Sequence, residues 1–255
     1  MCGRYGLKTT FATLAKLLRA EPLRDDAWEG PDYNIAPTDP APILLAAADG
    51  ARQLGLSHWG LVPSWAKDAR IGARMINARA ESFATKPAFR DAFRERRLLV
   101  PASGWYEWEA PPALAPGAAA KPQPHWLYPP TEPLLLFAGL WARWRDQLSG
   151  HTRHTFTIVT TDAAPSARAV HDRMPAILPT AAAQALWLAA DAEPAALQAL
   201  LVPYEGPLTH HPVARTVNSV HNDGPALIER LALADAPPPP TPHARTPKRQ
   251  GDLPL

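Results

Sequence analysis

The chain has 255 residues, 46% of them hydrophobic, and a formal net charge of +2 from 26 basic and 24 acidic residues. The length and hydrophobic fraction suit one large domain with a buried core, and the near-neutral charge neither requires nor excludes a nucleic-acid partner. The single cysteine excludes an internal disulfide framework, and the lack of a long apolar run or a leader-like start predicts a soluble cytoplasmic protein with no membrane span.

The predicted elements, taken in chain order, are short helices among more numerous strands. Residues 10–20 predict a helix, because Phe11, Leu14, Leu17 and Leu18 recur at helical spacing behind a threonine. Further strands are predicted in "RRLLVPASGWYEWEA" (two strands and a turn), "HWLYPP", "PLLLFAGLWARW", "HTFTIVTT" and "LTHHPVART". Further helices are predicted in "KPAFRDAFRERR", "TAAAQALWLA", "PAALQALLV" and "GPALIERLALA", and "SARAVHDRMPAILP" predicts a short helix followed by a turn and a strand. Because many strands are joined by turns too short for a crossover helix, the pattern predicts an α+β domain whose sheet is mainly antiparallel.

Two stretches have the composition of unpacked chain. Residues 111–124 are rich in proline and alanine and predict a flexible loop between strands. From residue 237 to 255 the tail is proline-rich and basic, which predicts disorder because it has too few apolar residues for a core. The predicted folded domain therefore covers residues 1–236.

The only cysteine, Cys2, directly follows Met1 in the opening "MCGRYG". Aminopeptidases remove an initiator methionine before a small residue, and the chain would then begin with a 1,2-aminothiol. The α-amine titrates near pH 8 and the thiol near 8.5, so both nucleophiles are usable near neutral pH. An aldehyde would form a Schiff base with the amine, and the thiol would then close a thiazolidine ring. The alternative interpretation is a small hydrophobic residue beside the start.

Two polar residues lie in strand-like, apolar surroundings. Asn77, in "RMINARAES", could orient a terminal amine or a sugar hydroxyl, or it could be a turn asparagine. Glu107, in "SGWYEWEA", is bracketed by large aromatic residues, which would raise its pKa toward that of a general acid. The alternative for Glu107 is an exposed carboxylate at a sheet edge.

A third segment and several cations complete the candidates. His171 could shuttle protons and has Asp172 and Arg173 beside it, although a lone histidine is often structural. Trp65 lies in a Gly/Pro turn and could stack on an unpaired base. A local basic surface could form from Arg4, Lys67, Arg70, Arg74 and Arg79. No His-x₃-His or His-Glu-x-x-His pattern is present, so no metal site or cofactor is expected.

Together the motifs resemble the SOS-response-associated peptidase family of abasic-site-processing proteins. The resemblance extends through "MCGRYG", "YNIAPT", "WGLVPSW", "INARAES", "SGWYEW", "VHDRMP" and "VNSVHNDGPALIE" in that order. Each motif is weak alone, but their order and spacing are specific. The resemblance implies a single domain with a barrel-like β core flanked by helices, and a positively charged groove for single-stranded DNA.

The resemblance also implies an activity and a set of roles. After loss of Met1, Cys2 would capture the open-chain aldehyde of an abasic site as a thiazolidine DNA–protein crosslink. Asn77 would position the terminus and the sugar, Glu107 would act as general acid and base, and His171 would move protons at the sugar and its 3′ phosphate. Self-removal of Met1 and lyase-type Schiff-base chemistry are further implied.

The DNA-binding roles are implied in the same way. Arg4 and Arg79 would bind phosphates, Arg74 would contribute to the basic surface, and Trp65 would stack where a single strand meets a duplex. The partner would be single-stranded DNA with abasic sites, bound by a monomer. Family members of this type carry two adjacent tryptophans at the turn, whereas here Ala66 follows Trp65.

Two other functions start from the same residues. An N-terminal-nucleophile glutamine amidotransferase would also use a processed Cys2, but it would need glutamine-binding motifs and a second domain that the sequence does not show. A non-catalytic single-strand-binding module would not need Cys2 at all. A glutaminase assay and a Cys2→Ala variant, respectively, discriminate these alternatives from covalent capture.

Overall fold

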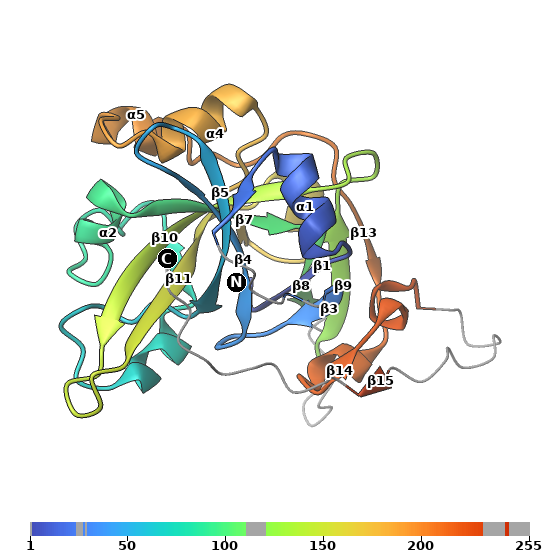
Figure 1. The fold of residues 1–255 in the computed structure, drawn as a ribbon. Helices are drawn as coiled ribbons and strands as arrows, with labels where there is room; N and C mark the ends of the chain where they lie inside the picture. Colours follow the sequence, from blue (N-terminus) through green and yellow to red (C-terminus); the bar gives the residue numbers. More distant parts are fainter. Residues whose placement is uncertain (1, 24–27, 29, 111–120, 232–242, 245–255) are drawn as a thin grey trace.

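The computed structural model describes residues 2–23, 28, 30–110, 121–231 and 243–244, and Figure 1 shows their arrangement. The strands are β1 (Arg4–Leu7), β2 (Glu21–Pro22), β3 (Asp32–Ile35), β4 (Pro40–Ala46), β5 (Arg52–Trp59), β6 (Asn77–Arg79), β7 (Arg97–Ala102), β8 (Gly104–Glu109), β9 (Gln123–Tyr128), β10 (Leu135–Arg145), β11 (Thr152–Asp162), β12 (Arg173–Pro175), β13 (Thr209–Pro212), β14 (Asn222–Asp223) and β15 (His243–Ala244). The helices are α1 (Phe11–Leu18), α2 (Arg90–Glu95), α3 (Pro165–Arg168), α4 (Ala181–Leu188) and α5 (Pro194–Ala199), with 3₁₀ turns η1 (Ala69–Arg74), η2 (Arg215–Asn218) and η3 (Pro225–Ile228).

Five strands close into a barrel in the order β5-β4-β7-β10-β11, because β11 pairs back onto β5. The closing pair is parallel, and the other pairs around the barrel are antiparallel. Strands β6 and β12 add to β11, and β2 adds to β5. The predicted α+β fold with a barrel-like, mainly antiparallel core is therefore confirmed.

A second sheet has the order β13-β9-β8-β1-β3 and is antiparallel throughout. The sequence predicted a turn between β7 and β8, but only Ser103 separates them, and the chain passes there from the barrel into the second sheet. The Ser103 N–H donates to the carbonyl of Gly6 at 2.8 Å, and its hydroxyl accepts from the N–H of Lys8. This switch brings β8 beside β1, the strand that follows Cys2.

Aromatic side chains join the two sheets in one core. Tyr5 of β1 packs edge-on against Trp59 of β5 with ring centroids 5.2 Å apart, and Trp105 of β8 packs edge-on against Phe137 of β10 at 6.1 Å. All four side chains are fully buried. Such edge-to-face pairs add specific geometry to apolar burial, so β1 and β8 are held firmly against the barrel.

The predicted helices are confirmed with one exception. In α1 the Thr10 side chain caps the first turn, and Leu14 and Leu18 are buried, whereas Leu17 is exposed. The helix predicted in "GPALIERLALA" is wrong for the described residues 224–231, where the chain forms the 3₁₀ turn η3 and no α-helix. Gly224, which precedes Pro225, has φ +114°. After η3 the backbone is extended at Glu229, and the N–H of Leu231 donates to the carbonyl of Pro212.

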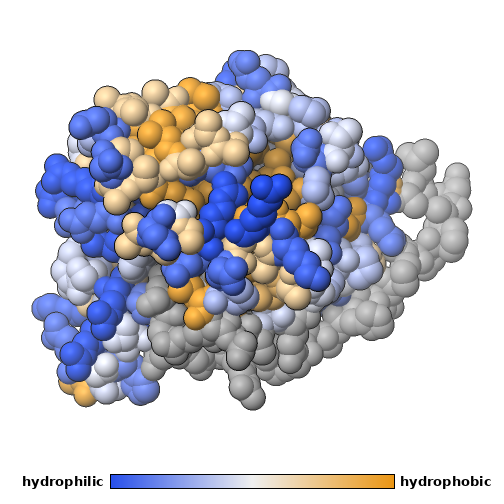
Figure 2. Space-filling view, turned by 45° about the horizontal axis from the view of Figure 1, so that its top comes forward, coloured by the Kyte–Doolittle hydropathy of each residue, from blue (hydrophilic) through white to orange (hydrophobic). Residues whose placement is uncertain are grey.

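The predicted loop and tail fall largely outside the described residues. Strand β9 begins at Gln123, so it includes the last two residues of the predicted 111–124 loop, and residues 111–120 lie outside the described ranges. Within the predicted tail, the structure describes the backbone of β15, which pairs with β14. Figure 2 shows apolar side chains gathered over α4 and α5. Within the described ranges, no helix has the length and apolar character needed to cross a bilayer.

Candidate functional site

The structure brings Cys2, Asn77, Glu107 and His171 together from four separate segments. Cys2 precedes β1 and Glu107 lies on β8 of the second sheet, whereas Asn77 begins β6 and His171 precedes β12 on the barrel side. A hydrogen bond joins Asn77 to Cys2, and the charge of the chain's amino terminus acts on both Glu107 and His171. The four predicted residues therefore share one site where the two sheets meet.

The Cys2 thiol is fully buried and lies 3.9 Å from the carbonyl oxygen of Arg4. Burial is the main cause that raises its pKa well above the usual value, and the neighbouring Glu107 carboxylate raises that pKa further. The thiol is therefore protonated at neutral pH in the chain that still carries Met1. Because the Glu107 carboxylate lies close enough to disfavour the Cys2 thiolate, it also lies close to the thiol, which must lose its proton before the sulfur can react.

Asn77 binds the backbone of the cysteine rather than its sulfur. Its Nδ2 donates to the carbonyl oxygen of Cys2 at 2.7 Å, and its Oδ1 is buried without a hydrogen-bond partner among the described residues. Strand alternation puts Asn77 and the exposed Arg79 on one face of β6, with Ala78 buried on the other. The alternative of a turn asparagine is wrong, because β6 pairs with β11 from Asn77 onward.

Glu107 is a buried carboxyl at the position predicted for an acid/base group. Its residue is 2% exposed, so the alternative of an exposed edge glutamate is wrong. Burial raises its pKa from 4.5 to about 7, although the positive charge of the amino terminus opposes the shift. Continuing the pairing of Arg4 with Tyr106 places Glu107 opposite Gly3, directly beside Cys2. A carboxyl with this pKa can both donate and accept a proton at neutral pH.

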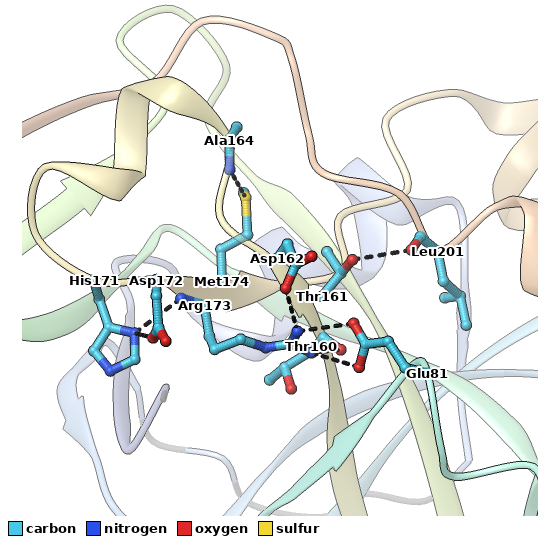
Figure 3. A network of polar contacts seen from close by, with 10 residues as sticks. All are labelled: Glu81, Thr160, Thr161, Asp162, Ala164, His171, Asp172, Arg173, Met174 and Leu201. Atoms are coloured by element: carbon cyan, nitrogen blue, oxygen red, sulfur yellow. Dashed lines mark hydrogen bonds and ion pairs between the residues drawn. The ribbon is translucent and has the colours of Figure 1, made fainter.

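His171 has two contacts on a single ring nitrogen (Figure 3). Its Nδ1 accepts from the backbone N–H of Arg173 at 2.9 Å and lies 2.8 Å from Oδ1 of Asp172. The first contact suits a neutral ring, and the second suits a ring protonated at Nδ1. Burial lowers the pKa of His171, and the charge of the amino terminus lowers it further, whereas Asp172 raises it. The surroundings thus offer a partner to each protonation state.

An arginine clamp holds the His171 segment to the Asn77 segment, as Figure 3 shows. Arg173 donates through Nη1 and Nη2 to the two carboxylate oxygens of Glu81 at 2.8 and 3.0 Å, and through Nη1 to Oδ1 of Asp162 at 2.6 Å. The two bonds from Arg173 to Glu81 lower the pKa of the Glu81 carboxyl. Sequence reasoning missed Glu81 and Asp162 because their shared partner lies far along the chain. The sequence feature that could have indicated these carboxylates was Arg173, because a cation beside a candidate histidine needs acidic partners.

The predicted DNA contacts occupy different environments. Arg74 and Arg79 are exposed, and Trp65 is 57% exposed. Arg4 is buried, and its Nη1 donates to Oδ1 of Asn34 at 2.7 Å and to the carbonyl of Val217 at 2.9 Å. Arg4 therefore anchors a distant segment against β1, and its contact with phosphate stays a prediction.

A histidine cluster that sequence reasoning missed lies beside Glu107. His125 of β9 pairs across the strands with Glu107 and is buried. Its Nε2 lies 2.9 Å from Oε2 of Glu109, and its Nδ1 lies 3.2 Å from Nδ1 of His210. Alternation in "WYEWE" could have indicated Glu109, but the pairing with β9 could not be read from sequence. In the described part of the chain, no group of three or more His, Cys, Asp or Glu side chains is arranged so that it could hold a metal ion.

Comparisons with known proteins agree on one group. The family model described as SOS response associated peptidase (SRAP) matches residues 1–220. The chain is 37% identical over 232 residues to the abasic site processing protein YoqW of Bacillus subtilis (strain 168), covering 90% of this chain and 99% of that protein. It is 29% identical over 233 residues to the abasic site processing protein HMCES of Xenopus tropicalis, covering 80% of this chain and 67% of that protein.

Solved structures support the same fold. A protein from Bacteroides thetaiotaomicron superposes with a TM-score of 0.78 at 24% identity, covering 91% of this chain and 100% of that chain. A phage-related protein from Bordetella bronchiseptica superposes with a TM-score of 0.63 at 30% identity, covering 84% of this chain and 95% of that chain.

Proposed function

Because the chain belongs to the SOS response associated peptidase family, whose curated relatives are abasic site processing proteins, we propose that it captures abasic sites in single-stranded DNA through Cys2. One observation carries the proposal: the carbonyl of Cys2 is held by Asn77 beside a carboxyl whose pKa is about 7. A site built around the backbone of residue 2 is suited to a nucleophile at the chain terminus. The family relationship supports abasic-site processing, and the covalent step is the proposal.

The first step is hydrolysis of the bond between Met1 and Cys2, which consumes one water and releases methionine. Glu107 would accept a proton from the attacking group and return it to the new α-amine. The buried, protonated thiol makes an acid/base partner necessary, since a thiol nucleophile must first lose its proton. This self-processing would be the peptidase activity.

Capture then follows at the terminus that Asn77 positions. The amine adds to the sugar aldehyde, and protonated Glu107 supplies the proton with which water leaves to form the imine. The thiol adds its sulfur to the imine carbon, and its proton passes to the nitrogen as the thiazolidine closes. His171, with a partner for either protonation state, would serve the sugar hydroxyls and the 3′ phosphate. Release of that phosphate from the imine stage would be the lyase-type reaction.

The DNA would lie along the side of β6 that carries Asn77 and Arg79. Arg79 is exposed on the same face as Asn77, and its charge also acts on Glu81 at the clamp. Arg74 and Trp65 would extend the contact toward a strand-to-duplex junction. We propose that a cytoplasmic monomer carries out this reaction without a metal or cofactor.

The test is a denaturing gel with protein whose intact mass confirms the loss of Met1. Single-stranded DNA with one abasic site should give a retarded band that survives SDS, and Cys2→Ala should abolish the band. Cys2→Ser is the matched control, since it keeps the terminal amine and a side chain of similar shape but replaces the thiol with a hydroxyl, and it should also give no band that survives SDS. If a protein that starts at Cys2 gives no band, the proposal fails, and a glutaminase assay and a plain binding assay test the amidotransferase and binding-module alternatives.

A further inference from the structure

We propose a second binding site on this chain: a cavity of about 300 Å³ that takes one unpaired nucleobase of the bound DNA strand. It lies between the turn before η1, the helix α2 and the strand β10. Its walls include Trp65 from the turn, Ala92 from α2, and Trp141 and Arg143 from β10. The inference rests on the proposed function and adds a subsite for the DNA next to the abasic sugar.

The cavity walls are suited to a flat aromatic ring. Trp65 is 57% exposed although it is a large apolar side chain, and Trp141 is only partly buried. Pro63 and Pro87 add further apolar surface to the lining. Every nucleobase offers a π-face, and stacking on indole is a recurrent way to bind single strands without reading sequence.

Trp141 supplies the second indole that the turn itself lacks. The residue after Trp65 is Ala66, which is buried, and its carbonyl accepts a hydrogen bond from Nε1 of Trp144 at 2.6 Å. Ala66 therefore packs in the protein interior and offers no surface to a base. The neighbouring aromatic ring at the cavity comes instead from β10, about 75 residues further along the chain.

The charges at the cavity favour a nucleotide over an apolar peptide. Arg143 is exposed, and its guanidinium forms no ion pair or hydrogen bond with any residue that the structure describes. The other ionisable lining residues have partners, since Arg96 pairs with Glu95 and Asp91 pairs with Arg90. The guanidinium of Arg143 can therefore bind a phosphate while the indoles of Trp65 and Trp141 contact the base of the same nucleotide.

Strand register relates the cavity to the site of Cys2. On β11, Ile158 pairs with Asn77 of β6, and Phe156, two residues earlier, pairs with Trp141 of β10. Because paired and alternate residues share a face, Asn77 and Trp141 lie on the same side of the sheet. Two strand spacings and two residues separate their Cα atoms by roughly 12 Å. The straight line between them passes the fully buried side chains of Phe156 and Ile158, so the bound strand would follow the surface around them, a path of several nucleotides.

The experiment measures non-covalent binding with the Cys2→Ala protein. The probes are labelled single-stranded oligonucleotides that contain one tetrahydrofuran, an abasic analogue without an aldehyde. In a series of probes, a second tetrahydrofuran removes one flanking base at a time. We expect one flanking position at which base removal weakens binding about tenfold, the scale of base–indole stacking. Trp141→Ala should weaken binding of the complete probe to the same extent and show no further loss when that base is removed.

Matched variants separate the subsite from the fold. Trp141→Phe should keep most of the binding, and Arg143→Ala should weaken it, whereas Arg145→Ala, on the same strand but outside the cavity, should have little effect. If the Trp141→Ala protein does not fold, the same comparison is made with Arg143→Ala: its loss of binding should likewise not add to the loss caused by removing the sensitive base. The inference would be overturned if the effects of the variant and of base removal were additive, or if removal of no flanking base weakened binding. Crosslinking by the wild-type chain shows separately whether the proposed function stands.

Discussion

At the scale of single residues, the site depends on what burial does to ionisable groups. Glu107 and the Cys2 thiol are both buried, and burial is the largest cause of the raised pKa of each. Their proximity adds to the effect on the thiol. One carboxyl near half-protonation can therefore serve both proton removal and proton delivery, which the proposed imine chemistry needs in turn.

Glu107→Gln tests this role because it keeps the shape of the side chain and removes its titration. We expect crosslink formation to slow about 100-fold, within the usual range for loss of a general acid or base. Single-turnover gels from pH 5 to 9 should show that the wild-type rate changes through pH 7 and that this inflection is absent in the variant. An unchanged inflection in Glu107→Gln would assign the titration to another group.

The same carboxyl predicts a pH dependence of stability. Its folded pKa of about 7 lies above the ordinary value of 4.5, so the folded state binds the proton more tightly than the unfolded chain. The resulting stabilisation is fully present below pH 4.5 and is lost as pH rises to 7, by about 3 kcal/mol at most. Chemical unfolding should show that Glu107→Gln loses less stability than the wild type between pH 5 and 8. Parallel curves would contradict the buried-carboxyl account.

Asn77 tests the positioning of the terminus. Asn77→Asp keeps the shape but replaces the donor to the Cys2 carbonyl with an oxygen, so the hydrogen bond becomes a repulsion. We expect crosslinking to slow about tenfold or more, with DNA binding by the Cys2→Ala form less affected. Asn77→Gln is the control, because it keeps the amide donor but places it on a side chain that is one methylene longer. A normal rate in Asn77→Asp would show that the bond is dispensable.

At the scale of elements, a close backbone approach positions β6. Gly60, just after β5, has φ +126°, and a Cβ there would lie 2.7 Å from the carbonyl oxygen of Gly72. A Cβ on Gly72 would lie 2.5 Å from the carbonyl oxygen of Gly60. The two glycines therefore let η1 pack against the end of β5, and this contact sets where Asn77 begins the next strand.

Gly60→Ala should cost about 3 kcal/mol of folding free energy, since it combines an unfavourable φ with a backbone clash. Gly50→Ala is a matched control, because Gly50 has φ +82° but open space around its Cβ position. Urea unfolding should therefore show a loss of only about 1 kcal/mol for Gly50→Ala. Equal losses in the two variants would mean that the contact with Gly72 contributes nothing.

At the scale of the whole molecule, the net charge of +2 is too small to attract DNA by itself. Binding must come from a few local cations, among which Arg74, Arg79 and Arg143 are exposed. For three phosphate contacts to a single strand, log Kd should change with log salt by a slope of about 2. Arg79→Ala should reduce that slope by about 0.7, measured by fluorescence anisotropy, and Arg145→Ala should leave it unchanged. A steep slope would indicate a wider basic surface.

Sequence alone predicted most of the elements, the family and the four candidate residues that the structure brings together. Cys2 could be proposed without the fold, because its place beside Met1 would make it a terminal aminothiol once Met1 is removed. Glu107 was also predictable, because its aromatic neighbours are adjacent in the chain and local burial raises its pKa.

Tertiary structure decided everything that joins distant segments. The closure of β11 onto β5, the Asn77 bond to the Cys2 carbonyl, the burial of Arg4 against Val217 and the cavity between Trp65 and Trp141 each link residues far apart in the chain. Sequence patterns report the local period of a helix or strand and the chemistry of neighbours. They carry no register between strands, and register is what places one segment's side chain against another's backbone.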